Sequence, residues 1–394
     1  MKRLFLLAVA LLSLSGCARA QKPTNEDNRL RHDIGQMLLV GFRGMQLDDS
    51  SHIVRDIRDH NIGGVILFEY DAPSGRHHRN IASPAQLRAL CTQLQSLRRS
   101  TLLIGIDQEG GRVSRLKTKQ GFPFFASAET QAASNDSVTY YARLTASTLA
   151  DMGINLNFAP CVDVNTNPDC PVIGKLERSF SASPQRVTQC AAIWVDELQR
   201  QGVTACLKHF PGHGSSSKDT HVGLADVSQT WSPVELQPYR QLLASQHDIR
   251  MIMTTHVFNT QLDSVYPATL SKPTLSTLLR DSLHFQGVII TDDLAMGAMV
   301  KQYSYPEILR QAILAGADML CLSNNGQDYN PDVVPQTIDL IYEMVMQGQI
   351  PASRIHESAL RIRHLKEQLD SMGKNRRSYR TIVTSPRQYG CFVP

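Results

Sequence analysis

Ionisable side chains of several types gather between Lys208 and His221. The stretch Lys208-His209-Phe210-Pro211-Gly212-His213-Gly214 is followed closely by Asp219-Thr220-His221. Its proline and glycines prevent it from forming a helix. The apolar run at 203–207 just before it is typical of a buried strand, so the charged side chains begin where that strand ends. In parallel α/β folds this is the place where active sites lie.

Asp219 and His221 have the residue types and the spacing of a proton-transfer pair. An unperturbed imidazole titrates at roughly pH 6.5, so it can both donate and accept a proton. A carboxylate two residues earlier can fix its tautomer if the segment is extended, because alternate side chains of an extended chain face the same way. The serines at 215–217 indicate a mobile loop, and we expect His221 to be in position only when substrate is bound.

A second pair of carboxylates, Asp292 and Asp293, follows the apolar run at 288–290. Because side chains alternate along a strand, only one of the two can point into a site at the strand end. Asp293 is expected to cap the helix that follows. The alternation alone does not decide which of the two carboxylates points into the site.

Short apolar runs alternate with longer amphipathic segments along most of the chain. Short, continuously apolar strands are typical of a parallel sheet covered on both faces. We expect strands at residues 37–41, 64–68, 102–107, 155–160, 203–209, 251–257, 288–292 and 319–323.

The segments between these runs carry apolar residues at helical spacing, several with proline in or near the first turn. This alternation favours an α/β fold with a single closed (β/α)8 TIM-type barrel over a doubly wound sheet. No G-x-G-x-x-G motif opens the first helix, which weakens the dinucleotide-binding alternative. We expect helices at 137–152, 184–201, 233–246, 273–283, 306–315 and 331–346.

The beginning of the sequence predicts export. Met1-Lys2-Arg3 and the apolar run at 4–14 have the form of a secretory signal, and the run is too short for a stable membrane span. Leu14-Ser15-Gly16-Cys17 resembles the bacterial lipobox, in which the cysteine is lipidated and becomes the mature N-terminus; cleavage after Ala20 is the alternative. We therefore expect a periplasmic or cell-envelope lipoprotein anchored by acyl chains at Cys17.

These signals divide the chain into a signal peptide at 1–17, a polar tether at 18–29, a barrel domain at 30–372 and a basic tail at 373–394. With 42% hydrophobic and 19% charged residues, the composition allows a large core. The formal charge of +4 is too small to indicate nucleic acid as a partner. The eight cysteines form no C-x-x-C pair, which argues against a zinc ribbon or a dithiol redox site.

The motif KHFPGHG at 208–214, with the D-[ST]-H motif that follows it, resembles the glycoside hydrolase family 3 β-N-acetylhexosaminidases, the NagZ-like enzymes. The resemblance extends over the expected barrel domain. Those enzymes remove N-acetylglucosamine from cell-wall fragments. It therefore implies a retaining β-N-acetylhexosaminidase whose substrates come from peptidoglycan.

The resemblance also implies catalytic roles. The family pattern I-[ST]-D-[DA]-L-x-M falls on residues 290–296 and implies Asp292 as the nucleophile of a two-step, retaining cleavage. Two-domain members supply a glutamate as acid/base from their second domain. The hexosaminidase branch uses a histidine held by an aspartate, which implies His221 as acid/base and Asp219 as its partner. Thr220 stands where this branch more often has serine.

Four further residues match positions at which the family binds the sugar, and Arg115, eight residues after Asp107, is a further candidate. One of the four lies in the D-Q-E-G-G-R motif at 107–112, and another precedes a Ser-Phe pair. The four are Asp107, Arg178, Lys208 and His209. Glu109 and Arg112 are expected to be structural and to form a salt bridge under the loop.

Three other interpretations stay open. A metal-dependent barrel hydrolase could draw zinc ligands from His209, His213, His221, His256 and Asp292, although Lys208 would repel a cation. A non-catalytic sugar-binding lipoprotein would not need Asp292 together with His221. A phosphorylase would use phosphate in place of water, because a neutral imidazole does not repel an anion. The favoured interpretation needs no cofactor or metal and expects a monomer whose partners are the glycan substrate and, through its anchor, the membrane.

Overall fold

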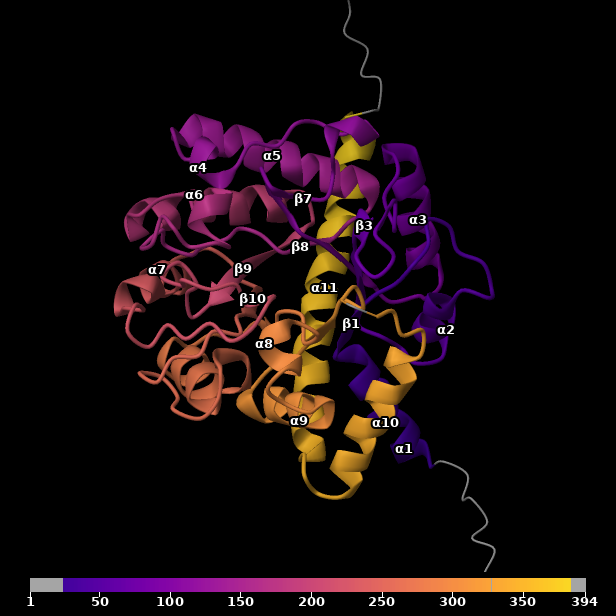
Figure 1. The fold of residues 1–394 in the computed structure, drawn as a ribbon. Helices are drawn as coiled ribbons and strands as arrows, with labels where there is room; N and C mark the ends of the chain where they lie inside the picture. The colour runs from indigo at the N-terminus through magenta and orange to yellow at the C-terminus, as the bar shows by residue number, and fades with distance from the viewer. Residues whose placement is uncertain (1–23, 327, 384–394) are drawn as a thin grey trace, which may run out of the picture.

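The computed structural model describes residues 24–326 and 328–383 (Figure 1). Eight parallel strands form one sheet in the order β11-β10-β9-β8-β5-β2-β1-β12, and a parallel bridge between Ile290 and Met319 joins its two ends. The sheet is thus closed into the predicted (β/α)8 TIM-type barrel. The strands are β1 Leu38–Gly41, β2 Gly64–Leu67, β5 Leu103–Ile106, β8 Leu156–Asn157, β9 Thr204–Phe210, β10 Met251–Thr254, β11 Val288–Ile290 and β12 Leu320–Leu322.

Each of the eight strands lies at a place where the apolar pattern predicted one. Their residues are buried throughout, as the continuous apolar runs require. The largest difference is at 155–160, of which only Leu156–Asn157 forms a strand. Pro160 lacks an N–H, and past it the pairing with β9 continues only as an isolated parallel bridge between Cys161 and Lys208. Gly105 in β5 is needed for packing, since a Cβ there would lie 2.9 Å from the ring of Phe158.

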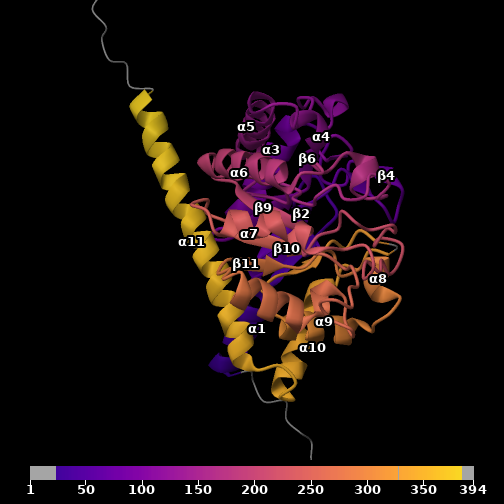
Figure 2. The same cartoon turned by 90° about the vertical axis from the view of Figure 1, so that its left-hand side faces the viewer.

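Helices surround the barrel, and α11 runs along one side of it (Figure 2). All six predicted helical segments are present. Ser83 and Ser183 cap helices whose first residue is proline, each accepting a bond from the backbone three residues on. The helices are α1 Asn25–Gln36, α2 His52–Arg58, α3 Pro84–Ser96, α4 Ala128–Gln131, α5 Asn135–Met152, α6 Pro184–Arg200, α7 Gln237–Leu243, α8 Gly297–Val300, α9 Tyr305–Ala315, α10 Val333–Met346 and α11 Ala352–Val383, with the 3-10 turns η2 Gly174–Leu176 and η3 Pro233–Leu236 and the π-helix η5 Pro273–Ser282.

Two short hairpins project from the strand ends. The first pairs β3 Tyr70–Asp71 with β4 Arg76–His77, and the second pairs β6 Gln108–Gly110 with β7 Val113–Ser114. The second hairpin directly follows β5, so it carries the D-Q-E-G-G-R motif to the carboxyl end of the barrel.

The helical structure extends past both expected ends of the barrel domain. Helix α1 begins at Asn25, inside the segment predicted as a tether, because Thr24 and Asp27 form a capping box and Tyr342 donates to Asp27 Oδ1 at 2.7 Å. Helix α11 continues to Val383. The predicted signal peptide and lipobox, and residues 384–394 of the predicted tail, lie outside the described residues. No helix of the described chain is long and apolar enough to cross a membrane.

A fully buried carboxylate, Asp318, connects the strands at which the barrel closes, β11 and β12, to the helices outside them. It accepts from the backbone N–H of Ile289 at 3.0 Å and from Ser358 Oγ at 3.0 Å. Arg354 donates to it at 3.1 Å, and Arg280 donates to it as well. The carboxylate therefore joins β11, η5 and α11 at the end of the barrel opposite the strand carboxyl ends.

Candidate active site

The predicted site residues all lie at the carboxyl ends of barrel strands or in the loops after them. Asp107 directly follows β5, Lys208 and His209 belong to β9, and Asp292 follows β11. The other members come from loops: Arg115 after β7, Arg178 after η2, and Asp219 and His221 after β9. The barrel therefore brings together residues that are up to 185 positions apart, from Asp107 to Asp292.

Lys208 is the buried cation at the base of the site. Its side chain is 2% exposed, and its Nζ lies 2.8 Å from Asp107 Oδ1 and 2.6 Å from Glu109 Oε1. Arg115 Nη2 lies 3.4 Å from the other oxygen of Asp107. Burial opposes ionisation of Asp107, but Lys208 and Arg115 hold its pKa below the usual range. Asp107 is therefore an ionised hydrogen-bond acceptor.

Glu109 pairs with Arg178 and Lys208, so the predicted salt bridge to Arg112 was wrong. Arg178 Nε and Nη2 donate to the two oxygens of Glu109 at 2.9 and 2.8 Å, a bidentate pair. Gly110 and Gly111 both have positive φ values, 104° and 54°, and their turn leaves Glu109 buried and Arg112 exposed. Glu109 was missed as a site residue because sequence gives no sign of a partner 69 positions away.

His209 connects this cluster to a second carboxylate. Its Nε2 lies 3.0 Å from Arg178 Nη2, and its Nδ1 lies 2.6 Å from Asp163 Oδ2. A guanidinium can only donate, so Nε2 accepts and Nδ1 carries the proton that is donated to Asp163. Both ring nitrogens are thus used within the protein. For His209 to contact a sugar, as its predicted role requires, one of these bonds must give way.

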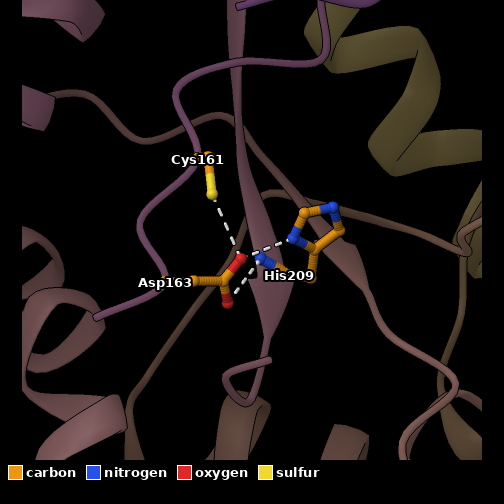
Figure 3. Close-up of side chains that lie close together, drawn as sticks. All are labelled: Cys161, Asp163 and His209. Carbon is orange, nitrogen blue, oxygen red and sulfur yellow. Dashed lines mark hydrogen bonds and ion pairs between the residues drawn. The ribbon is translucent and has the colours of Figure 1, made fainter. Parts of the chain in front are cut away.

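Asp163 is a fully buried residue that the sequence analysis missed (Figure 3). Besides His209, its carboxylate accepts from Cys161 Sγ at 3.1 Å and from the backbone N–H of His213 at 2.8 Å. Burial opposes its ionisation, but His209 holds its pKa below the usual range. The sequence did contain a signal, because Asp163 lies just past the predicted strand at 155–160, and Asp107 and Asp292 are the last residues of theirs.

Asp292 and Asp293 stand in different environments. Asp292 Oδ1 accepts from the backbone N–H of Asp293 at 2.8 Å. Burial opposes ionisation of Asp292, but the imidazoles of His256, His209 and His221 lower its pKa. In contrast, burial raises the pKa of Asp293. The environments move the two pKa values apart and favour Asp292 as the carboxylate that reacts.

Asp293 does not cap a helix, and that prediction was wrong. Helix α8 begins only at Gly297, after the N-cap Met296. The Asp293 carboxylate instead accepts from the backbone N–H of Ser323 at 3.0 Å and from Ser323 Oγ at 2.5 Å, just past β12. Asp293 lies too far before α8 for a capping bond, and Ser323, past the neighbouring strand β12, supplies the donors instead.

His221 and Asp219 form the predicted pair, though not in an extended segment. His221 Nδ1 lies 2.7 Å from Asp219 Oδ1, and the same oxygen accepts from the backbone N–H of His221 at 2.8 Å. A turn, in which Val222 and Gly223 donate to the carbonyl of Asp219, replaces the expected alternation. The side chain of His221 is 66% exposed, and His221 is one of the three histidines that act on Asp292.

Comparison with known proteins identifies the family to which this site belongs. Residues 29–365 match the model described as the glycosyl hydrolase family 3 N-terminal domain. The chain belongs to glycosyl hydrolase family 3. It is a glycoside hydrolase, as the motifs predicted, and the resemblance to the hexosaminidases of this family is confirmed.

Relatives of the family 3 chain carry matching names. A β-hexosaminidase of Alkalilimnicola ehrlichii is 35% identical over 313 residues, which are 76% of this chain and 83% of that protein. A family 3 β-N-acetylglucosaminidase from Paenibacillus superposes with a TM-score of 0.77 at 33% identity, over 86% of this chain but 62% of that longer chain. A β-N-acetylhexosaminidase from Beutenbergia cavernae superposes with a TM-score of 0.76 at 25% identity, over 86% of this chain and 98% of its own.

Cys161, Asp163 and His209 also have the donor types of a metal site, with candidate ligand atoms within 4.8 Å of one another. Their separations of 3.1 and 2.6 Å are hydrogen-bond lengths. Tetrahedral ligands held about 2.0–2.3 Å from zinc would lie roughly 3.3–3.7 Å apart. Burial keeps the pKa of the Cys161 thiol well above its usual value, so the thiol remains a donor. The group fits a hydrogen-bonded cluster better than a metal site.

The residues considered for zinc do not gather into one cluster in the part of the chain that the structure describes. His256 uses Nδ1 with Thr269 Oγ1 at 2.8 Å and Nε2 with the carbonyl of Asp293 at 2.9 Å. Both ring nitrogens of His209 are likewise used, Nε2 with Arg178 and Nδ1 with Asp163. The ring nitrogens of both histidines are thus committed to hydrogen bonds within the protein.

Glu235, in η3, is a buried carboxyl group that contacts the loop carrying Asp219 and His221. It is fully buried, and its Oε2 accepts from the backbone N–H of Gly214 at 2.9 Å. Its Oε1 has no hydrogen-bond partner among the described residues. Burial raises the pKa of Glu235 to about 7. The sequence analysis did not identify Glu235, because a glutamate in a first helical turn is usually solvated.

This raised pKa predicts a pH-dependent effect of Glu235→Gln on stability. Between the unfolded pKa of about 4.5 and the folded pKa of about 7, the folded chain keeps a proton that the unfolded chain has released. The free energy of unfolding therefore falls as pH rises through this window. Glutamine imitates the neutral form, so the variant should gain about 1–3 kcal/mol over the parent at pH 8 and little at pH 4.5.

Urea unfolding followed by circular dichroism at the two pH values measures this difference. Glu129→Gln, at an exposed position, is the matched control and should show no pH-dependent gain. An equal effect of Glu235→Gln at both pH values would contradict the assignment.

Proposed function

We propose that this family 3 barrel is a retaining β-N-acetylhexosaminidase with Asp292 as nucleophile and the His221–Asp219 pair as acid/base. The observation that carries the proposal is the environment of Asp292, an ionised carboxylate past β11 that faces imidazoles, with His221 on a neighbouring loop. The names of its relatives, a β-hexosaminidase and a β-N-acetylglucosaminidase, support the choice of sugar.

In the first step, an oxygen of Asp292 bonds to the anomeric carbon while the glycosidic bond breaks. The protonated His221 delivers its Nε2 proton to the leaving oxygen, and its Nδ1 proton stays on the bond to Asp219. In the second step the neutral Nε2 removes a proton from water, which attacks the anomeric carbon and releases Asp292. Two displacements at one carbon give retention.

The opposite side of the mouth would bind the sugar hydroxyls. Asp107 supplies carboxylate acceptors, and Lys208, Arg115 and Arg178 supply donors that are already held in place by ion pairs. Rigid, preformed partners reduce the ordering cost of binding. We assign these residues, with His209, to the non-reducing N-acetylglucosamine unit.

Peptidoglycan fragments are the proposed source of the substrate, and the cell envelope is the proposed location. The lipobox-like Leu14-Ser15-Gly16-Cys17 supports an anchor at Cys17, which would place the enzyme near the wall.

Asp292→Asn should remove nucleophilicity while keeping volume, so turnover of a chromogenic β-N-acetylglucosaminide should fall about a thousandfold or more. Mass spectrometry after treatment with a slow fluorinated glycosyl donor should place the adduct on the peptide that contains Asp292. The neighbouring Asp293→Asn is the control and should mainly lower stability. An inverted product anomer or an adduct elsewhere would overturn the proposal.

His221→Ala should lower kcat/KM about 10²- to 10⁴-fold for substrates with poor leaving groups and far less for an activated phenol, because only the former need a proton in the first step. Asp219→Ala should give a milder version of the same pattern. Equal losses for both substrate classes would exclude His221 as the acid. Product analysis in phosphate buffer shows whether the acceptor is water or phosphate.

Cys17→Ser should release the protein from the membrane fraction of the producing cell, because the thiol that would carry the acyl chains is gone. Fractionation followed by immunoblotting measures this. A membrane fraction as large as that of the parent would rule out lipidation as the anchor.

A further inference from the structure

The loop that carries His221 is fastened at several points, although His221 itself is exposed. The sequence predicted a mobile loop from the serines at 215–217, yet Ser215 and Ser216 are buried. We propose that His213, Thr220 and Gly297 form a clamp that positions His221 beside Asp292. The inference rests on the proposed role of His221 as acid/base, and it makes these three positioning residues.

The first half of the clamp is the bond between His213 and Thr220. His213 Nε2 lies 3.2 Å from Thr220 Oγ1, and the two residues are 3% and 2% exposed. Burial lowers the pKa of His213 to about 4, so the ring is neutral near neutral pH and can donate through Nε2. The hydroxyl therefore holds the backbone one residue before His221 in a buried position.

The backbone of His213 is itself fixed by a buried carboxylate. Its backbone N–H donates to Asp163 at 2.8 Å, and the next N–H, of Gly214, donates to Glu235 at 2.9 Å. The clamp is thus built on the same buried carboxylate, Asp163, that orients His209.

The second half of the clamp is the start of α8. The backbone N–H of Gly297 donates to the carbonyl of His221 at 3.2 Å, and that of Ala298 donates to the carbonyl of Thr220 at 3.0 Å. Amides in a first helical turn have no partner within the helix, so the loop satisfies them. Lys301 Nζ adds a bond to the carbonyl of Val222 at 2.8 Å.

Gly297 permits this close contact. A Cβ at this position would lie 2.6 Å from the carbonyl oxygen of His221 and 2.8 Å from that of Val222. Those atoms are backbone, so an alanine requires the loop to shift. Because α8 follows Asp292 by only a few residues, the contact couples the position of the proton donor to that of the nucleophile.

The test compares substrates with poor and with activated leaving groups. Thr220→Val, which removes the hydroxyl at nearly constant volume, and Gly297→Ala should each lower kcat/KM for the poor leaving group about tenfold or more. Activity on the activated phenol should stay within about twofold. Thr220→Ser keeps the hydroxyl and should restore parental values for both. Thr145→Val, at a buried position in α5, is the matched control and should change neither.

Hydrogen exchange at the amides of Gly297 and Ala298 tests the clamp without reference to catalysis. Thr220→Val should speed their exchange, and unchanged exchange overturns the clamp. If exchange speeds up while both substrate classes respond equally, the clamp stands and the proposed role of His221 fails. If exchange speeds up and only the poor leaving group is affected, both are supported.

Discussion

A buried chain of ion pairs and hydrogen bonds fixes one side of the mouth of this barrel. Each ion removed from water costs several kcal/mol, and only its partners offset that cost, so the members depend on one another. Loss of Glu109, for example, would leave Arg178 without its carboxylate partner and would remove one of the two carboxylates that face Lys208. The chain runs in order through Asp163, His209, Arg178, Glu109, Lys208 and Asp107. It joins the loops after β5 and β8 to β9, so this geometry is set before any ligand arrives.

The proposed acid/base, His221, is fixed by fewer and weaker contacts than this chain of buried ion pairs. His221 is exposed and is fixed by backbone contacts to α8 and by the His213–Thr220 bond. The two sides meet at Asp163, because its carboxylate receives both the ring of His209 and the backbone of His213. Under the proposed function, a rigid sugar site beside a proton donor on a clamped loop suits a reaction in which the sugar stays while the aglycone and then water exchange at His221.

The sequence was sufficient to predict the barrel and the residues at the carboxyl ends of its strands. Apolar runs define buried strands, and a polar residue directly after such a run, such as Asp107 or Asp292, must lie at the carboxyl rim. Pairing across loops could not be derived in the same way. Whether Glu109 meets Arg112 or Arg178 depends on a turn at two glycines, and whether Asp293 meets a helix or β12 depends on sheet closure. Both are set by tertiary structure, which local patterns do not encode.

The same electrostatics explain why Asp292, and not Asp107, is suited to attack carbon. The oxygens of Asp107 are held by Lys208 at 2.8 Å and by Arg115 at 3.4 Å, so their charge is already neutralised. Asp292 accepts one backbone N–H, and the groups that lower its pKa are imidazoles. It is ionised without being tied to a permanent cation, which leaves an oxygen free to form a bond. These two carboxylates at one rim thus differ in their suitability for nucleophilic attack, because only Asp107 has fixed cations as partners.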